Sequence, residues 1–92
     1  MKSIICDYDD HCFLCGSYRD IEIHHVMGGA NRKLSDKYGL IIPLCHSCHN
    51  EPPHGAHFNA ETMNYLKGVA QTEFEHLFSH EEWMDIFGKN YL

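Results

Sequence analysis

Cysteine and histidine are the most unusual feature of this 92-residue sequence, which contains five cysteines and nine histidines. Four cysteines form two pairs of identical spacing, Cys12-x2-Cys15 and Cys45-x2-Cys48. Two intervening residues let one tight turn direct both sulfurs at a single ion, and two such pairs complete a tetrahedron. The spacing therefore predicts a structural Zn²⁺ held by all four cysteines. The fifth, Cys6, is expected to be a small buried hydrophobic residue.

Disulfides and a redox site are the alternatives for these cysteine pairs. The N-terminal residues hold one lysine and a short apolar stretch, so we expect no signal peptide and a cytoplasmic location, where thiols stay reduced. No thioredoxin-like pattern surrounds either pair, which argues against a redox role. Zinc also suits so short a chain, because metal binding contributes about 10–16 kcal/mol to the folding of small zinc modules.

The histidines need a separate explanation, since a four-cysteine site uses none of them. His24 and His25 are adjacent in a stretch, residues 21–26, whose apolar residues alternate as in a strand. Neighbouring side chains of a strand point to opposite faces, so the two imidazoles suit different roles. One can bind a metal, while the other, with an ordinary pKa near 6.5, can act as a general base. An isolated pair of this kind would more simply be two half-exposed strand residues.

Three further histidines follow the second cysteine pair closely: His49, His54 and His57. A zinc shared by the two cysteine pairs would hold this segment near His24. We therefore expect a second metal site formed by His24, His49 and either His54 or His57. Taken singly, each of the last two would be an ordinary polar loop residue.

The elements that must position these residues are short. We expect strands at residues 21–26 and 40–44, a helical turn at 35–39 and, between them, a basic loop at 27–33. Asn59 caps a predicted helix of about 17 residues, and Ser79 begins a capping box for a second helix that ends at Gly88. Apolar residues at three- and four-residue steps predict that both helices pack on the strands. The fold class is α+β.

Charge and hydropathy exclude some functions. The formal net charge is −6, which argues against a simple polybasic nucleic-acid binder. The acidic excess lies in residues 1–10 and 58–92, whereas residues 11–57 are formally neutral. The longest apolar run, residues 40–45, is too short to span a membrane.

Taken together, three motifs are similar to the HNH nuclease superfamily with a four-cysteine zinc: Cys12-x2-Cys15, His24-His25 and Leu44-Cys45-x2-Cys48-His49. The resemblance covers about residues 12–58 and implies a zinc-stabilised ββα-metal, treble-clef unit, here extended by helices over 59–92. Residues 22–26, 28–33, 37–40 and 55–58 further resemble small HNH proteins of phages and prophages. A more distant likeness is to the RecA-dependent nucleases that enhance phage recombination. The whole chain, 1–92, then forms one nuclease domain.

This resemblance implies a role for each site residue. The ion held by the histidines would be Zn²⁺, Mg²⁺, Mn²⁺ or Ni²⁺, and it would stabilise the leaving oxygen of a phosphodiester. The resemblance makes His24, His49 and His57 its ligands (with His54 as the substitute), His25 the general base, and Arg32 and Lys33 the residues that hold neighbouring phosphates.

Two departures from the family pattern bear on this assignment. The central asparagine that steadies the base histidine is missing, because Gly39 and Leu40 occupy its place. Asn31 is the candidate substitute and Asn50 a poorer one. Prolines at positions 52–53 interrupt the helix that many relatives continue, which keeps His54 open as a ligand.

The resemblance therefore predicts a metal-dependent DNA endonuclease or nickase with a role in phage recombination or DNA processing. DNA and a recombination protein are the expected partners, and the chain would act as a monomer or homodimer. The alternative is a non-catalytic zinc module that binds nucleic acid or a protein partner. We favour the nuclease because only it accounts for the histidines. The missing asparagine and the net charge of −6 favour the alternative.

Overall fold

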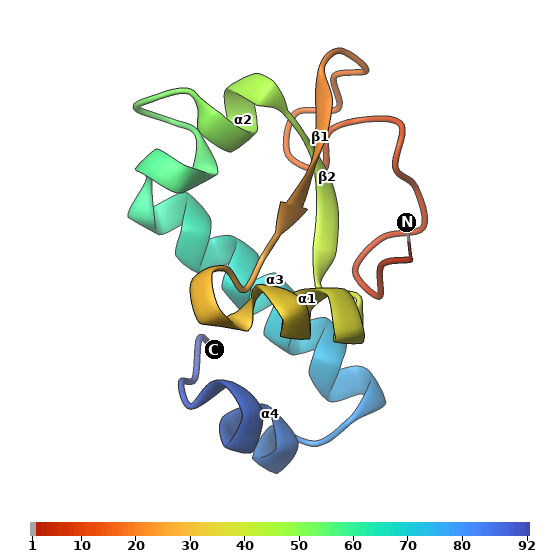
Figure 1. The fold of residues 1–92 in the computed structure, drawn as a ribbon, viewed down its shortest axis with the longest axis vertical. Coiled ribbons are helices and arrows are strands. Elements are labelled where there is room, and N and C mark those ends of the chain that lie inside the picture. The colour runs from red at the N-terminus through yellow and green to blue at the C-terminus, as the bar shows by residue number, and fades with distance from the viewer. Residues whose placement is uncertain (1) are drawn as a thin grey trace.

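Two antiparallel strands form the centre of the structure, a computed structural model that describes residues 2–92 (Figure 1). β1 (Ile21–His25) pairs with β2 (Ile41–Cys45), with Ile21 opposite Cys45 and His25 opposite Ile41. In this register the end of β1 that carries His24 and His25 lies beside the start of β2, and the start of β1 lies beside Cys45 of the second cysteine pair. The same two strands therefore position both the histidines and the cysteines.

Helices surround this hairpin. In Figure 1, α1 crosses one end of the strands, α2 and η2 lie near the other end, α3 runs diagonally past the sheet, and α4 lies beyond α3. The elements outside the sheet are η1 (Gly29–Asn31), α1 (Arg32–Tyr38), α2 (His46–Asn50), η2 (Ala56–Phe58), α3 (Ala60–Leu77) and α4 (His80–Phe87).

The predicted caps define the helix ends. The Asn59 side chain accepts a hydrogen bond from the Thr62 N–H at the start of α3, and Ser79 accepts one from Glu82 at the start of α4. Gly39 ends α1 with a φ of 70°, a left-handed conformation that glycine adopts without strain. A Cβ there would also lie 2.9 Å from the Lys2 carbonyl oxygen, so the approach of the N-terminal segment requires glycine.

The core lies between β2 and the two C-terminal helices. Every residue of β2 is buried, including Pro43, which pairs with Ile23 and accepts a hydrogen bond from the Phe13 N–H. The rings of Phe74 and Trp83 pack edge to face with centroids 5.4 Å apart. The largest apolar side chains of this core are Leu40, Ile42, Leu44, Leu66, Phe74 and Trp83.

The α+β class and the small zinc-type ββα arrangement predicted from the sequence are confirmed. Three details differ. Residues 32–38 form two turns of helix rather than one. Leu77, the last of the apolar residues whose three- and four-residue steps predicted packing of the first long helix, is 64% exposed at the end of α3. Cys6 is only partly buried, and its thiol donates a hydrogen bond to the Tyr8 carbonyl. No helix among the described residues is long and apolar enough to cross a membrane.

Candidate functional site

The four paired cysteines converge at one end of the sheet. Their sulfurs all lie within 4.8 Å of one another, close enough to hold a single metal ion. Each pair forms the same tight turn: Cys12 Sγ accepts from the Cys15 N–H at 3.5 Å, and Cys45 Sγ accepts from the Cys48 N–H at 3.4 Å. Four sulfurs at this separation form the donor set of a structural zinc site.

The electrostatics of this cluster fit a bound cation. Burial opposes ionisation of Cys12, but hydrogen bonds from neighbouring backbone N–H groups outweigh it and lower the pKa of this thiol to about 7. Burial and the other three sulfurs raise the pKa of Cys48. Four thiolates cannot coexist here without a positive ion, so these residues suit a metal such as zinc.

Three histidines converge in a second cluster. One ring nitrogen from each of His24, His49 and His57 lies within 4.8 Å of the others, and the Nε2 atoms of His49 and His57 are 3.0 Å apart. They come from three different elements, β1, α2 and η2. His54 is not in this group; its Nε2 forms a 2.7 Å hydrogen bond with the Ser47 hydroxyl.

His24 is the most unusual member of this histidine cluster. It is completely buried, and neither ring nitrogen has a hydrogen-bond partner among the described residues. Burial, reinforced by the neighbouring His49 and His57, lowers the pKa of His24 to about 3. The ring is therefore neutral at physiological pH, the form in which imidazole binds metals. A buried polar group without a partner is costly, and a metal ligand role would satisfy one of its nitrogens.

Glu22 orients His49. Its Oε1 accepts a hydrogen bond from His49 Nδ1 at 2.8 Å and another from the Asn50 amide at 3.0 Å. The hydrogen bonds from His49 and His46 lower the pKa of the Glu22 carboxyl. Because Nδ1 donates to this carboxylate, the lone pair of His49 is on Nε2, which faces His57. A carboxylate behind a histidine in this way is the usual support of a metal-binding imidazole.

His25 has a different partner from the one expected. Its Nε2 lies 2.8 Å from Oδ1 of Asp36 on α1. Asn31, the sequence-based candidate for steadying His25, forms no side-chain hydrogen bond among the described residues, and Asn50 donates to Glu22 instead. A carboxylate oxygen accepts, so the proton of His25 sits on Nε2 and its Nδ1 carries the lone pair. Such a ring can take a proton through Nδ1.

A recess of about 300 Å³ connects these groups. His25, His49 and His57 line it together with Arg32 from the start of α1 and the backbone of the glycine turn at residues 28–29. Lys33, the next residue of α1, is exposed and does not line the recess. His25, two members of the histidine cluster and Arg32 thus line the same solvent-accessible space.

Sequence reasoning missed Glu22 and Asp36. Glu22 stands two residues before His24 in the same strand, and this acidic residue in a strand otherwise apolar before the histidines was a usable signal. Asp36 gave no signal, because a polar residue in a short helix usually faces solvent.

Comparison of the chain with protein-family models, curated proteins and solved structures gives no match.

Proposed function

We propose that this protein is a metal-dependent endonuclease that hydrolyses phosphodiester bonds in DNA. The observation that carries the proposal is the arrangement around the recess, where a histidine cluster and an oriented base histidine lie side by side. A protein that used only its four cysteines would have no need for a buried histidine without hydrogen-bond partners.

His24, His49 and His57 hold a second divalent ion in this proposal. Their neutral imidazoles favour Zn²⁺ or Ni²⁺ over Mg²⁺, although metal availability also decides occupancy. When bound there, the ion supplies Lewis-acid stabilisation of the oxygen that leaves the scissile phosphate. Glu22 keeps His49 in the tautomer with a free Nε2.

His25 acts as the general base. Its Nδ1 takes a proton from a water in the recess, while its Nε2–H stays hydrogen-bonded to Asp36. The positive charge that develops on the imidazole is then stabilised by the adjacent carboxylate, an arrangement that also prevents the ring from rotating. In this site Asp36 does the work that the resemblance gave to an asparagine.

Arg32 binds the substrate. Its guanidinium lines the recess and forms no ion pair within residues 2–92, so it is free to bind the phosphate oxygens of a strand placed over His25. Lys33 contacts a neighbouring phosphate further from the chemistry. The role of such an enzyme is phage recombination or DNA processing.

Metal content combined with a nicking assay tests the proposal. Purified protein should hold two ions per chain, one of which is lost when the histidines are changed. Supercoiled plasmid should be nicked when Mg²⁺, Mn²⁺, Ni²⁺ or Zn²⁺ is added. One tightly bound zinc per chain, with no nicking under any of these ions, would leave the non-catalytic zinc module as the function.

A further inference from the structure

The C-terminal segment is fixed against α3 by two buried polar side chains. Gln71, which is fully buried, donates to Asn90 Oδ1 at 2.8 Å and accepts from the Tyr91 N–H at 2.7 Å. The indole N–H of buried Trp83 donates to the Lys89 carbonyl at 2.8 Å. Buried polar groups are retained where their hydrogen bonds hold a defined arrangement. The last residues therefore have a specified position on the helix.

This position brings two lysines to one aromatic ring. Lys67 Nζ lies 5.4 Å from the centroid of the Tyr91 ring, and Lys89 Nζ lies 5.2 Å from it. They are the only lysine or arginine residues of the segment 58–92, which carries six acidic ones. Two positive charges therefore lie against one aromatic ring in an otherwise acidic segment, an arrangement that suits an anionic ligand.

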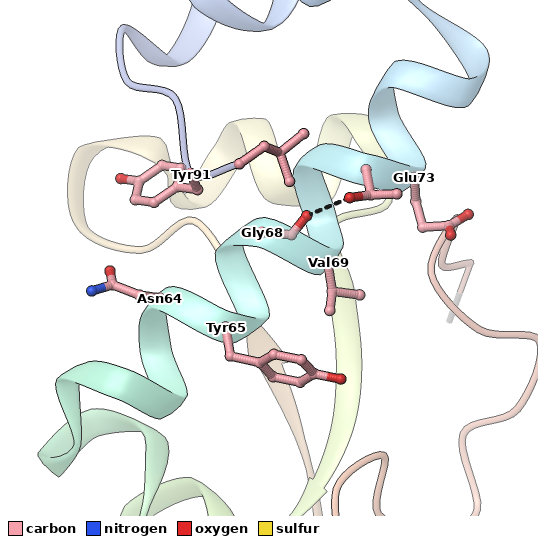
Figure 2. A pocket seen from close by; sticks show the side chains of 8 residues that line it. Asn64, Tyr65, Gly68, Val69, Glu73 and Tyr91 are labelled. Carbon is pink, nitrogen blue, oxygen red and sulfur yellow. Dashed lines mark hydrogen bonds between the residues drawn. The ribbon is translucent and has the colours of Figure 1, made fainter.

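Neither lysine is neutralised by the protein. Every ion pair formed within residues 2–92 has histidine as its cation, although acidic residues outnumber Lys and Arg by 13 to 7. Figure 2 shows that the Tyr91 ring and the Asn64 amide extend to one side of α3, whereas Glu73 points to the other. Tyr91 and Glu73 both line the groove along α3 that Figure 2 shows, whereas the two lysines lie beside the Tyr91 ring and are not part of its lining.

The same helix leads to the histidine cluster. α3 contacts η2, the turn that carries His57. A polymer with regularly spaced negative charges could therefore contact both places at once.

We propose that Lys67, Lys89 and Tyr91, here named the Tyr91 surface, bind the sugar–phosphate backbone of a nucleic-acid strand that also occupies the histidine recess. The inference rests on the proposed nuclease function for the path of the strand, but phosphate binding at this surface is measurable without cleavage. In a chain of net charge −6, a few unpaired cations provide most of the attraction for DNA.

The test compares DNA affinity at several salt concentrations. The zinc-loaded full chain, without other divalent ions, is titrated onto fluorescently labelled duplex DNA. Each phosphate contact contributes about 0.9 to the slope of log affinity against log salt. Lys67→Ala/Lys89→Ala should lower this slope by about 1.8. Lys67→Arg/Lys89→Arg should keep it.

Lys37→Ala is the control for the loss of a lysine that lies over a tyrosine ring elsewhere on the protein. Lys37 also lies over a tyrosine ring, 5.3 Å from the centroid of Tyr38, but it lines a different groove with Leu77 and Phe78. Its removal should leave the slope unchanged, and the melting temperature of each variant shows whether folding is intact. A slope that is unchanged in the double variant, or lowered equally by Lys37→Ala, overturns the proposal.

Two other measurements separate this proposal from the nuclease proposal and from binding of an acidic protein. If the double variant loses the two contacts while wild-type protein never nicks DNA under any metal, the Tyr91 surface stands and the nuclease function fails. If wild-type protein nicks DNA but the double variant has the wild-type slope, the reverse holds. Binding of polyglutamate, measured for wild type and the double variant, is the second measurement. If the double variant loses polyglutamate binding while its DNA salt slope stays at the wild-type value, the surface binds an acidic protein partner and the proposal is overturned.

Discussion

The Ser35 hydroxyl forms two hydrogen bonds with the backbone of Met27, accepting from its N–H at 2.9 Å and donating to its carbonyl at 2.8 Å. Ser35 is fully buried, precedes Asp36 on α1, and faces a residue two positions after His25. This contact fixes α1 against the end of β1. It places Asp36 within side-chain reach of His25, whose Nε2 lies 2.8 Å from the Asp36 carboxylate.

Asp36→Ala should lower cleavage by about 10- to 100-fold, the usual effect of losing a supporting carboxylate. The base histidine would lose its fixed tautomer, so the turnover number should fall while KM and metal content stay near wild type. Asn31→Ala is the control, because the Asn31 side chain forms no hydrogen bond with His25. Equal losses in the two variants would contradict the role of Asp36.

His25→Ala should retain both metals and the fold but lose about 10²- to 10⁴-fold in cleavage, the contribution of a positioned general base. His24→Ala and His49→Ala should instead lose or weaken the second metal while they keep the four-cysteine zinc. Metal stoichiometry, measured beside plasmid nicking, distinguishes the two groups. Near-wild-type cleavage by His25→Ala would contradict its assignment as the base.

Removal of zinc by a strong chelator should unfold the domain, because metal binding and folding are coupled in small zinc modules. Circular dichroism and the fluorescence of Trp83, the single tryptophan, report the change. Cys45→Ser should have the same effect, whereas Cys6→Ser should keep the zinc because Cys6 lies outside the cluster. Unchanged spectra after verified zinc loss would show that the metal is not structural.

Arg32→Ala and Lys33→Ala should each weaken DNA binding to a similar extent for all sequences, since phosphate contacts carry no base information. Each should lower the salt slope by about 0.9. Arg32 lines the recess, so its loss should also reduce cleavage. A wild-type slope for either variant would make that residue a solvated loop charge.

His24 should make the protein less stable in mild acid. Its pKa in the folded protein, about 3, is below its ordinary value of 6.5, so the unfolded chain binds more protons below pH 6.5. The stability contribution is complete above pH 6.5 and is lost as the pH falls. Between pH 7.5 and 5, zinc-loaded protein without a second metal should lose about 2 kcal/mol more than His24→Leu.

Urea unfolding at each pH measures this difference, and cysteine protonation affects both proteins equally. His76→Leu, which changes an exposed histidine, should behave like wild type. If wild type and His24→Leu have parallel pH profiles, the buried ring is not held neutral.

The sequence predicted the elements well where a local signal exists. Asn59, Ser79 and Gly88 define their helix ends through their own side chains or φ angles, so the caps could be read directly. The zinc ligands could also be predicted from the cysteine pairs, because a spacing of two residues restricts the two sulfurs to one side of a tight turn. The prediction that His24 and His49 belong to one cluster followed from the zinc shared by the two cysteine pairs, which would hold the segment after Cys48 near His24.

The contacts that orient the site could not be predicted in the same way. Asp36 and His25 are eleven positions apart, and their contact depends on how α1 packs on the end of β1, where Ser35 bonds to Met27; no periodic pattern in the sequence predicts this. The choice of His57 over His54 likewise depends on the turn after the prolines, which directs His54 to Ser47. Long-range placement of this kind is a property of packing rather than of local propensity.

The chain crosses from one cysteine pair to the other through exposed residues 28–30. The part before this crossing holds the first cysteine pair and β1, and the part after it holds β2 and the second pair. A protein cut at the crossing would thus consist of two fragments. Each fragment would carry two of the four cysteine ligands and one of the two paired strands. The metal ion and the two-stranded sheet would then hold the fragments together, so that their association would depend on the zinc concentration.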